Sequence, residues 1–359
     1  MQIDISVLET ITTWTSYWGF ADPTENLRNS RVWVLSAQQD SVVATEVCKK
    51  LNVGHLRLHS ERACLQVVKK LQEFYTLFNN DPSDNIKGVY NQSGEHSQLT
   101  LDYGNDCTEL AEPYLNKCGY DAAGNLLQHI FKNSLVTPPS PASNGSVYSF
   151  NQAIFFDGEV WAAAFGMSKE GYIYIPKACA AGAKCKLHVA FHGCEMTPDD
   201  IGTQYVNHGG YNSWADFNKM VVLYPQAKTN TLNPKGCWDW WSYSGLAYAS
   251  NIGAQTLTVK RMIDALTGSP RTPNTTACEP HQEAHMHAVL NKVATLPVQG
   301  VPAVRSAGVF EDESLNAVLG NPVNDNKGVC WPSKGFKMFA EAAAAGKIAP
   351  TNAQNLRGQ

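Results

Sequence analysis

Short apolar runs separated by polar turns predict a series of strands along the chain. Residues 31–36 (RVWVLS) form the first run, which ends in a polar loop that carries Asp40. Three further runs, 172–176, 187–191 and 221–224, are rich in β-branched or aromatic residues and are closed by turn residues. We therefore expect buried strands at these four positions.

Other segments repeat their apolar residues with a helical period. Residues 62–79 gather aliphatic and aromatic side chains on one face, and 121–131 (DAAGNLLQHIF), 211–220 and 252–266 also favour helices. One of these helices falls between two predicted strands, which gives a strand–helix–strand order. That order is typical of a parallel sheet with crossover helices, so the sequence predicts the α/β class.

The composition changes along the chain in a way that suggests domain boundaries. The stretch TPPSPASNGS at 137–146 has the composition of a linker. Beyond Thr267 the sequence becomes polar and then alanine-rich, without a strong period. We therefore expect residues 1–267 to form the α/β domain and residues 268–359 to form a C-terminal extension of unknown role.

The overall charge argues against two classes of partner. The 359 residues are 43% hydrophobic and 17% charged, with a net charge of −4 and a pI near 6.2. Nucleic acids and anionic membranes both attract a basic surface, so neither is expected as the main partner. The longest apolar stretches, such as 160–165, are too short to span a bilayer. We expect a monomer that acts on a substrate.

Cysteine usage and glycosylation motifs both point to an oxidising compartment. The ten cysteines are an even number, and none forms the CxxC pairs of a structural zinc site. Sequons at Asn91, Asn144 and Asn274 predict a secreted glycoprotein. The N-terminus, MQIDISVLETITTW, lacks the basic region and apolar core of a signal peptide. We therefore expect an extracellular protein whose export signal lies upstream of this sequence.

Three features could carry the chemistry of a serine esterase. The segment LHVAFHGC at 187–194 reads as a buried strand leading into His-Gly-Cys, where a backbone N–H could bind an oxyanion. Asp40 follows a predicted strand, and His96 lies in a polar loop after a glycine. Each has an ordinary alternative, because a loop aspartate is often a helix cap and most histidines are surface or core residues.

Two clusters of chemically distinctive side chains have competing interpretations. The run GCWDWWSYSG at 236–245 could either pack a core or line a hydrophobic groove for a polymer. His281, His285 and His287 suggest a metal site, but Glu283 stands in neither position that the zinc-protease motifs require. We therefore expect a polar linker there, with no metal and no cofactor.

Taken together, these segments resemble the secreted polyhydroxybutyrate depolymerases whose α/β-hydrolase domain is circularly permuted. The resemblance covers about residues 6–266 in family order, and its stretches include RVWVLSAQQDSVV, the His96 loop, YLNKCGYDAAGNLLQHIF, GYIYIPKAC, CKLHVAFHGC, YNSWADFNKMVVLYPQA and GCWDWW. In the usual hydrolase order the oxyanion strand precedes the acid and the base. Here HGC follows both, as a permuted strand order implies.

The resemblance implies hydrolysis of a polyester to short hydroxyacids through an acyl-enzyme. Asp40 and His96 match the triad acid and base, the Cys194 N–H matches an oxyanion donor, and Trp238 matches the substrate-binding wall. The implied disulfides are Cys107–Cys118, Cys179–Cys185 and Cys194–Cys237. A Cys278–Cys330 pair rests only on the number of cysteines that remain, and Cys48 and Cys64 stay unassigned.

The sequence departs from this family at the nucleophile. No serine has glycine at both the −2 and the +2 position, as the G-x-S-x-G elbow requires. We therefore expect that the elbow segment is absent, that the N-terminus is incomplete and that the chain by itself is inactive. Two alternatives stay open: another secreted esterase that acts on feruloyl or acetyl esters, and a non-catalytic polymer-binding protein.

Overall fold

The computed structural model describes residues 4–43, 66–156 and 159–268. The expectations for the C-terminal extension, the His281 cluster, Asn274 and the cysteines at 48, 64, 278 and 330 lie outside these ranges. The chain divides into two compact units, the first made of residues 1–137 with 208–210 and the second of 138–207 with 211–359. The boundary at residue 137 falls at the start of the predicted linker.

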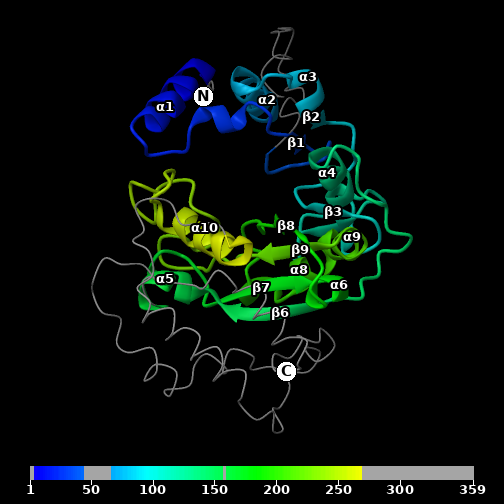
Figure 1. Cartoon of the computed structure of the whole chain (residues 1–359). Helices are drawn as coiled ribbons and strands as arrows, with labels where there is room; N and C mark the ends of the chain where they lie inside the picture. Colours follow the sequence, from blue (N-terminus) through cyan, green and yellow to red (C-terminus); the bar gives the residue numbers. More distant parts are fainter. Residues whose placement is uncertain (1–3, 44–65, 157–158, 269–359) are drawn as a thin grey trace, which may run out of the picture. The chain divides into compact units, whose positions relative to one another are not determined.

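Unit 1 contains four helices and two small parallel sheets among its described residues (Figure 1). Strands β1 and β2 form one sheet, and β3, β5 and β4 form the other in that order. The elements are α1 (Ile5–Tyr17), a 3-10 turn (Thr24–Leu27), β1 (Val32–Leu35), α2 (Gln66–Phe78), α3 (Pro82–Asn85), β2 (Ile86–Val89), β3 (Gln98–Thr100), β4 (Asn105–Asp106), β5 (Leu115–Lys117) and α4 (Ala122–Ile130).

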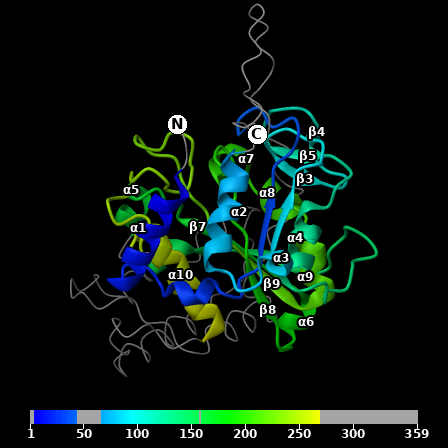
Figure 2. The same ribbon diagram turned by 90° about the horizontal axis from the view of Figure 1, so that it is seen from above.

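Helices α2 and α4 hold the strands of unit 1 in place. Helix α2 packs against β1 and β2, and α4 packs against β1 and β3 (Figure 2). Asp121 caps α4, since its carboxylate accepts a hydrogen bond from the Gly124 N–H at 2.7 Å. Ala122 at the start of α4 then joins Ala37 and Leu99 in a buried cluster. Through Ala37, the cluster includes the start of the loop that follows β1.

A short segment from later in the chain belongs to unit 1. The imidazole of His208 stacks on the ring of Tyr103, with ring centroids 3.6 Å apart. Beside it, the Gln98 side-chain amide donates to the Gly209 carbonyl at 3.2 Å. The segment 208–210 is therefore fixed to the region around β3 although it lies more than a hundred residues away in sequence.

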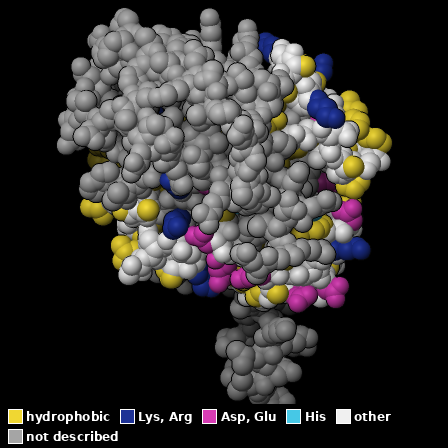
Figure 3. Space-filling view, turned by 90° about the horizontal axis from the view of Figure 1, so that it is seen from below, with side chains coloured by type: hydrophobic (Ala, Val, Ile, Leu, Met, Phe, Trp, Pro, Cys, Tyr) yellow, Lys and Arg dark blue, Asp and Glu magenta, His cyan; other side chains and the backbone are white. Residues whose placement is uncertain are grey.

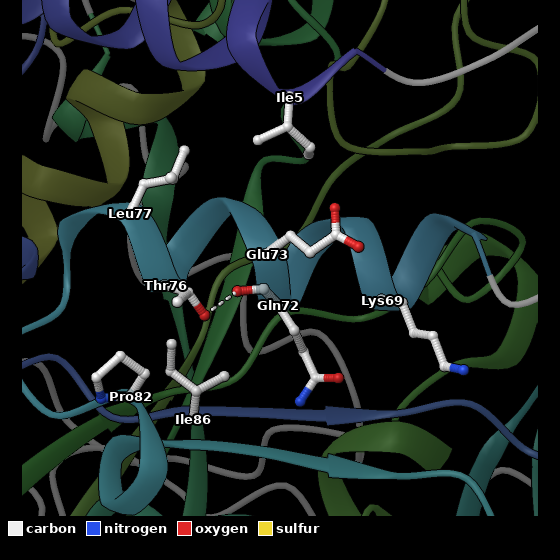
Figure 4. Close-up of a pocket in the computed structure, with 8 residues that line it drawn as sticks. All are labelled: Ile5, Lys69, Gln72, Glu73, Thr76, Leu77, Pro82 and Ile86. Atoms are coloured by element: carbon white, nitrogen blue, oxygen red, sulfur yellow. Dashed lines mark hydrogen bonds between the residues drawn. The ribbon is translucent and has the colours of Figure 1, made fainter.

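A surface hollow in unit 1 lies between α1 and α2 (Figure 4). In the close-up, Ile5 of α1 points toward α2, which contributes Gln72, Glu73 and Leu77 to the lining. The Thr76 hydroxyl donates to the Gln72 carbonyl at 2.8 Å, a bond within the helix. None of the predicted site residues lines this hollow, so it is separate from the chemistry considered below.

Unit 2 is built on a four-stranded sheet in the order β6-β7-β9-β8. The elements are β6 (Ser146–Asn151), a 3-10 turn (Gln152–Phe155), α5 (Glu159–Ala164), β7 (Glu170–Ile175), α6 (Lys177–Ala180), β8 (Lys186–Val189), α7 (Pro198–Ile201), α8 (Gln204–His208), α9 (Tyr211–Asn218), β9 (Met220–Tyr224) and α10 (Ala254–Thr267). Strand β9 is buried along its whole length, as a central strand should be.

The predicted α/β class with parallel strands is confirmed, and the sheet of unit 2 contains antiparallel pairs as well. Strands β8 and β9 pair in parallel, with α9 packed against β9. The pairs β6–β7 and β7–β9 are antiparallel. The sequence analysis did not predict β6, because the first residue of this strand lies inside the predicted linker, and so the antiparallel β6–β7 pair was not anticipated. The described fold is therefore a mixed α/β arrangement.

The surface of the described residues agrees with the small net charge. In the part of Figure 3 that these residues form, basic side chains are scattered among acidic and hydrophobic ones. None of the described helices combines the length and the apolarity needed to cross a membrane.

Gln152, which follows the edge strand β6, is 1% exposed, and its side-chain amide bonds to the segments next to β7 and β9. Its Nε2 donates to the carbonyls of Ser168 and Gln226 at 2.6 and 2.5 Å, and its Oε1 accepts from the Gln226 N–H at 3.1 Å. Substituting Gln152→Leu leaves these groups buried without partners, so unit 2 should lose about 3 kcal/mol of unfolding free energy. Denaturant unfolding measures the loss, with Gln38→Leu at an exposed glutamine as the control. Equal stability of the two variants would contradict the prediction.

Candidate functional site

The predicted acid and base lie in two loops that follow neighbouring parallel strands of unit 1. Strands β1 and β2 pair in register from Val32 with Ile86 to Leu35 with Val89. Asp40 lies in the loop after β1, and His96 lies in the loop after β2. Because parallel strands present their carboxyl ends at one edge of a sheet, the two loops start side by side.

Backbone hydrogen bonds continue the pairing beyond the ends of both strands. The Ser36 N–H donates to the carbonyl of Val89, the last residue of β2, at 3.0 Å. Farther along, the N–H groups of Gln38 and Gln39 donate to the Gln92 and Gly94 carbonyls of the second loop at 2.9 and 3.0 Å. Gly94 adopts a φ of +148°, and a Cβ at this position would lie 2.6 Å from Leu99 Cδ2. Glycine therefore permits the turn that brings the second loop alongside the first.

Asp40 and His96 meet at hydrogen-bond distance where these loops end. The His96 Nδ1 lies 3.0 Å from the Asp40 Oδ2. The other carboxylate oxygen, Oδ1, accepts from the N–H groups of Val42 and Val43 at 3.0 and 2.7 Å. The Asp40 side chain is 11% exposed and that of His96 is 48% exposed. The carboxylate is thus held on both oxygens, while the imidazole is open to solvent.

The two side chains favour each other's charged forms. Burial raises the pKa of Asp40, but the hydrogen bonds from His96 and from the Val43 and Val42 N–H groups outweigh it, so the pKa lies below its usual range. The hydrogen bond to Asp40 raises the pKa of His96 against the opposing effect of burial, and the charges of Asp40 and Glu95 add to the increase. A carboxylate that holds Nδ1–H and raises the basicity of the ring suits a general base acting through Nε2.

The predicted oxyanion loop follows β8 in unit 2. Ala190 extends the pairing of β8 with β9, since its N–H donates to the Leu223 carbonyl at 2.9 Å. The next residues, Phe191 and His192, carry the chain into Gly193 and Cys194. The sequence predicts a buried strand leading into His-Gly-Cys. The structure has the strand, but β8 lies at the edge of its sheet and is only half-buried, and Phe191 is exposed.

The buried imidazole of His192 links this loop to the backbone after β9. Its Nε2 accepts from the Ala227 N–H at 3.0 Å, so the ring proton lies on Nδ1, which is 2.6 Å from the Gly193 carbonyl. Burial lowers the pKa of His192 and keeps the ring neutral. His192 therefore acts as a structural link between two backbone segments, a role that the sequence did not reveal.

Cys194 is tied to a second loop by a disulfide. Its bond to Cys237 brings the two Cα atoms to 4.2 Å, and the neighbouring Glu195 N–H donates to the Lys235 carbonyl at 2.7 Å. Asn233 fixes the other side of the disulfide, because its amide accepts from the Cys237 N–H at 2.9 Å and donates to the Cys237 carbonyl at 2.8 Å. Among the described residues, nothing accepts a hydrogen bond from the Cys194 N–H.

The aromatic run divides between the two interpretations that the sequence left open. Trp238 packs edge-on against Phe191, with centroids 5.0 Å apart, and lies 5.6 Å from the ring of His192. Trp240 and Trp241, in contrast, are 71% and 37% exposed. Trp238 thus packs against Phe191 and His192 in the loop after β8, while Trp240 is exposed and Trp241 partly so.

Three disulfides occur among the described residues, Cys107–Cys118, Cys179–Cys185 and Cys194–Cys237. They are the three pairs that the resemblance implies, and they fit a protein of an oxidising compartment. No group of three or more His, Cys, Asp or Glu residues in the described ranges could hold a metal ion. Each half of the predicted site is therefore assembled within its own unit, Asp40 with His96 in unit 1 and Cys194 with Trp238 in unit 2.

Sequence comparison relates the chain to depolymerases of poly(3-hydroxybutyrate). A depolymerase of that name from Delftia acidovorans is 36% identical over 277 residues, which are 77% of this chain and 49% of the relative. A polyhydroxybutyrate depolymerase from Talaromyces funiculosus is 38% identical over 192 residues, 49% of this chain and 54% of the relative. The chain spans about half the length of these curated relatives. No protein-family model matches it.

Structural comparison gives the same relationship. The crystal structure of PHB depolymerase from Penicillium funiculosum matches 71% of this chain and 76% of its own, with a TM-score of 0.60 and 28% identity. A serine-to-alanine variant of a PHB depolymerase, in complex with a 3-hydroxybutyrate trimer, matches 73% and 78% with a TM-score of 0.61 and 28% identity. The chain is therefore homologous to these depolymerases in both sequence and fold.

The pairing of Asp40 with His96 can be tested by titration. Substituting Asp40→Asn removes the charge that raises the pKa of His96, while burial of the ring still lowers it. The pKa of His96, followed by NMR of the imidazole, should therefore fall. Asp106→Asn, at an exposed position in unit 1, should leave it unchanged. An unaltered His96 pKa in the Asp40→Asn variant would show that the two side chains do not interact in solution.

Proposed function

We propose that this chain, which is homologous to poly(3-hydroxybutyrate) depolymerases, is the part of a serine ester hydrolase that supplies the catalytic acid, the catalytic base and one oxyanion donor. Its substrate would be a polyester of short hydroxyacids. The relatives' names and the bound trimer in one related structure support this substrate class. The observation that carries the proposal is the 3.0 Å contact between His96 Nδ1 and Asp40 Oδ2.

In the proposed mechanism, each group has one task in acyl transfer. His96 Nε2 takes the proton of the serine hydroxyl as its oxygen attacks the ester carbonyl, and Asp40 stabilises the imidazolium that forms. The Cys194 N–H donates to the developing oxyanion. His96 then returns the proton to the departing alcohol oxygen, and water repeats the sequence to release the hydroxyacid. Trp238 would form part of the wall against which the substrate lies.

We propose that the nucleophile comes from sequence outside these 359 residues. No serine of the chain has glycine at both −2 and +2, and His-Gly-Cys follows the acid and base in chain order. In a circularly permuted hydrolase, the elbow would precede the segment that carries the acid. The chain alone should then show neither ester hydrolysis nor labelling by a fluorophosphonate.

Supplying the nucleophile tests this proposal. We would fuse the segment of the trimer-bound PHB depolymerase that contains its substituted serine, with serine restored, to the N-terminus and measure release of 3-hydroxybutyrate from the trimer. The fusion should hydrolyse the trimer, and His96→Ala should lower kcat by roughly a thousandfold or more, because triad members act as a unit. The matched control is His208→Ala, at a histidine outside the proposed triad. A folded, fluorophosphonate-reactive fusion that is unaffected by His96→Ala would refute the assignment of the base.

The rate of that fusion should also depend on the ionisation of His96. Only the neutral ring accepts a proton, and its bond to Asp40 raises the pKa above the ordinary value of about 6.5. The trimer-cleaving kcat/KM should therefore fall about tenfold per pH unit below the raised pKa. The midpoint should move to lower pH in the Asp40→Asn variant. A flat profile through this range would contradict the assignment.

A second candidate function is binding of the polymer without hydrolysis. The absence of an elbow serine and the exposure of Trp240 and Trp241 favour it. Under this alternative, the 359-residue chain binds polyhydroxybutyrate film, Trp240→Ala weakens the binding, and the serine-supplied fusion does not cleave the trimer. Cleavage of the trimer by that fusion would favour the hydrolase over the binding protein.

We further propose that the protein is a secreted monomer, with residues 1–267 as the hydrolase domain and 268–359 as an extension. The three disulfides support an extracellular location. Asn91 and Asn144, the sequon residues in the described ranges, are both exposed and so could carry glycans.

A further inference from the structure

We propose that Glu95 is a positioning residue that fixes the Asp40 loop to the backbone of His96 and so sets the geometry of the acid–base pair. This inference deepens the proposed function, since it takes the pair as catalytic. Glu95 immediately precedes His96 in the loop after β2. It is only 8% exposed, which is rare for a glutamate outside a binding or structural contact.

A single carboxylate oxygen of Glu95 joins the two loops. Its Oε1 accepts from the Ser41 N–H at 2.5 Å and from the His96 N–H at 2.8 Å. Ser41 directly follows the proposed acid, and His96 is the proposed base. Glu95 is itself anchored, because its N–H donates to the Cys107 carbonyl at 2.9 Å and Cys107 is crosslinked to Cys118.

Carboxylates accept the hydrogen bonds of three successive N–H groups in the turn after Asp40. These groups donate first to Glu95, from Ser41, and then to Asp40 itself, from Val42 and Val43. A turn whose N–H groups converge on anions is held in one conformation, and that conformation sets the direction of the Asp40 side chain. Without Glu95 the first of these bonds is lost, and Asp40 is free to move away from His96.

Glu95 has an alternative role as a source of charge. The charged groups that act on His96 are Asp40 and Glu95, and both raise the pKa of the imidazole. A purely electrostatic role needs the negative charge of Glu95 but not the full length of its side chain. A positioning role needs that length and an acceptor oxygen but not the charge. Two conservative substitutions separate these requirements.

The first measurement is the pKa of His96 in the 359-residue chain, by NMR of the imidazole. Glu95→Gln keeps the acceptor and the length but removes the charge, while Glu95→Asp keeps the charge and shortens the side chain by one methylene. Positioning predicts a decrease of about one pH unit in the aspartate variant, since the Asp40 bond is lost, and a clearly smaller decrease in the glutamine variant. Asn79→Ala, which breaks hydrogen bonds to Leu27 and Ser30 elsewhere in unit 1, should leave the value unchanged.

Two outcomes would overturn the inference. A decrease in the glutamine variant that equals or exceeds that in the aspartate variant would make the role electrostatic. Unfolding of unit 1 in the aspartate variant would make Glu95 a scaffold residue.

The titration needs no ester and no nucleophile, so it is independent of the proposed activity. In the serine-supplied fusion, Glu95→Asp should lower kcat by roughly tenfold to a hundredfold with KM unchanged, because displacement of the acid affects only the reacting geometry. Glu95→Gln should restore most of the rate. If the fusion cleaves no trimer, the proposed function fails, while the order of the two pKa decreases still decides the role of Glu95.

Discussion

The parallel pairing of β1 and β2 is the constraint on which the acid–base pair depends. Each strand is only four residues long, yet hydrogen bonds from Ser36, Gln38 and Gln39 extend their pairing into the following loops. Asp40 and His96 come from positions more than fifty residues apart, and each alone is an ordinary loop residue. They meet because two loops that follow neighbouring parallel strands are bonded to each other through the N–H groups of Gln38 and Gln39.

The periodic segments of the sequence were sufficient to locate much of this fold. Strand β9 and helices α4 and α9 were predicted because each carries a continuous or amphipathic apolar pattern that decides its own conformation. Strand β2 was missed because it is short and contains Gly88, so its sequence has little local preference for a strand. Its extended conformation depends on pairing with β1 and packing against α2. Strand β6 was missed because its first residue lies in a segment whose composition is typical of a linker.

The sequence analysis predicted the site residues whose roles follow from resemblance to a family. It did not predict the residues whose roles depend on tertiary contacts. Resemblance to the depolymerases made Asp40, His96, Cys194 and Trp238 candidates, and the structure brings the first two into contact within unit 1. Nothing in the sequence distinguished Glu95 from a solvated loop residue or His192 from a candidate base. Their roles depend on which backbone N–H groups fold back on them, and such contacts are set by tertiary structure.

The crosslink between Cys194 and Cys237 has a consequence for how the protein matures. The loop that bears the proposed oxyanion donor is anchored through this bond, together with the hydrogen bonds of Asn233 and Glu195. A freshly synthesised chain has two thiols there, and its loop is held by hydrogen bonds alone. The donor therefore reaches its final rigidity only after an oxidation step. The cell's redox conditions at the time of folding, and not the sequence alone, thus determine how well this loop is organised.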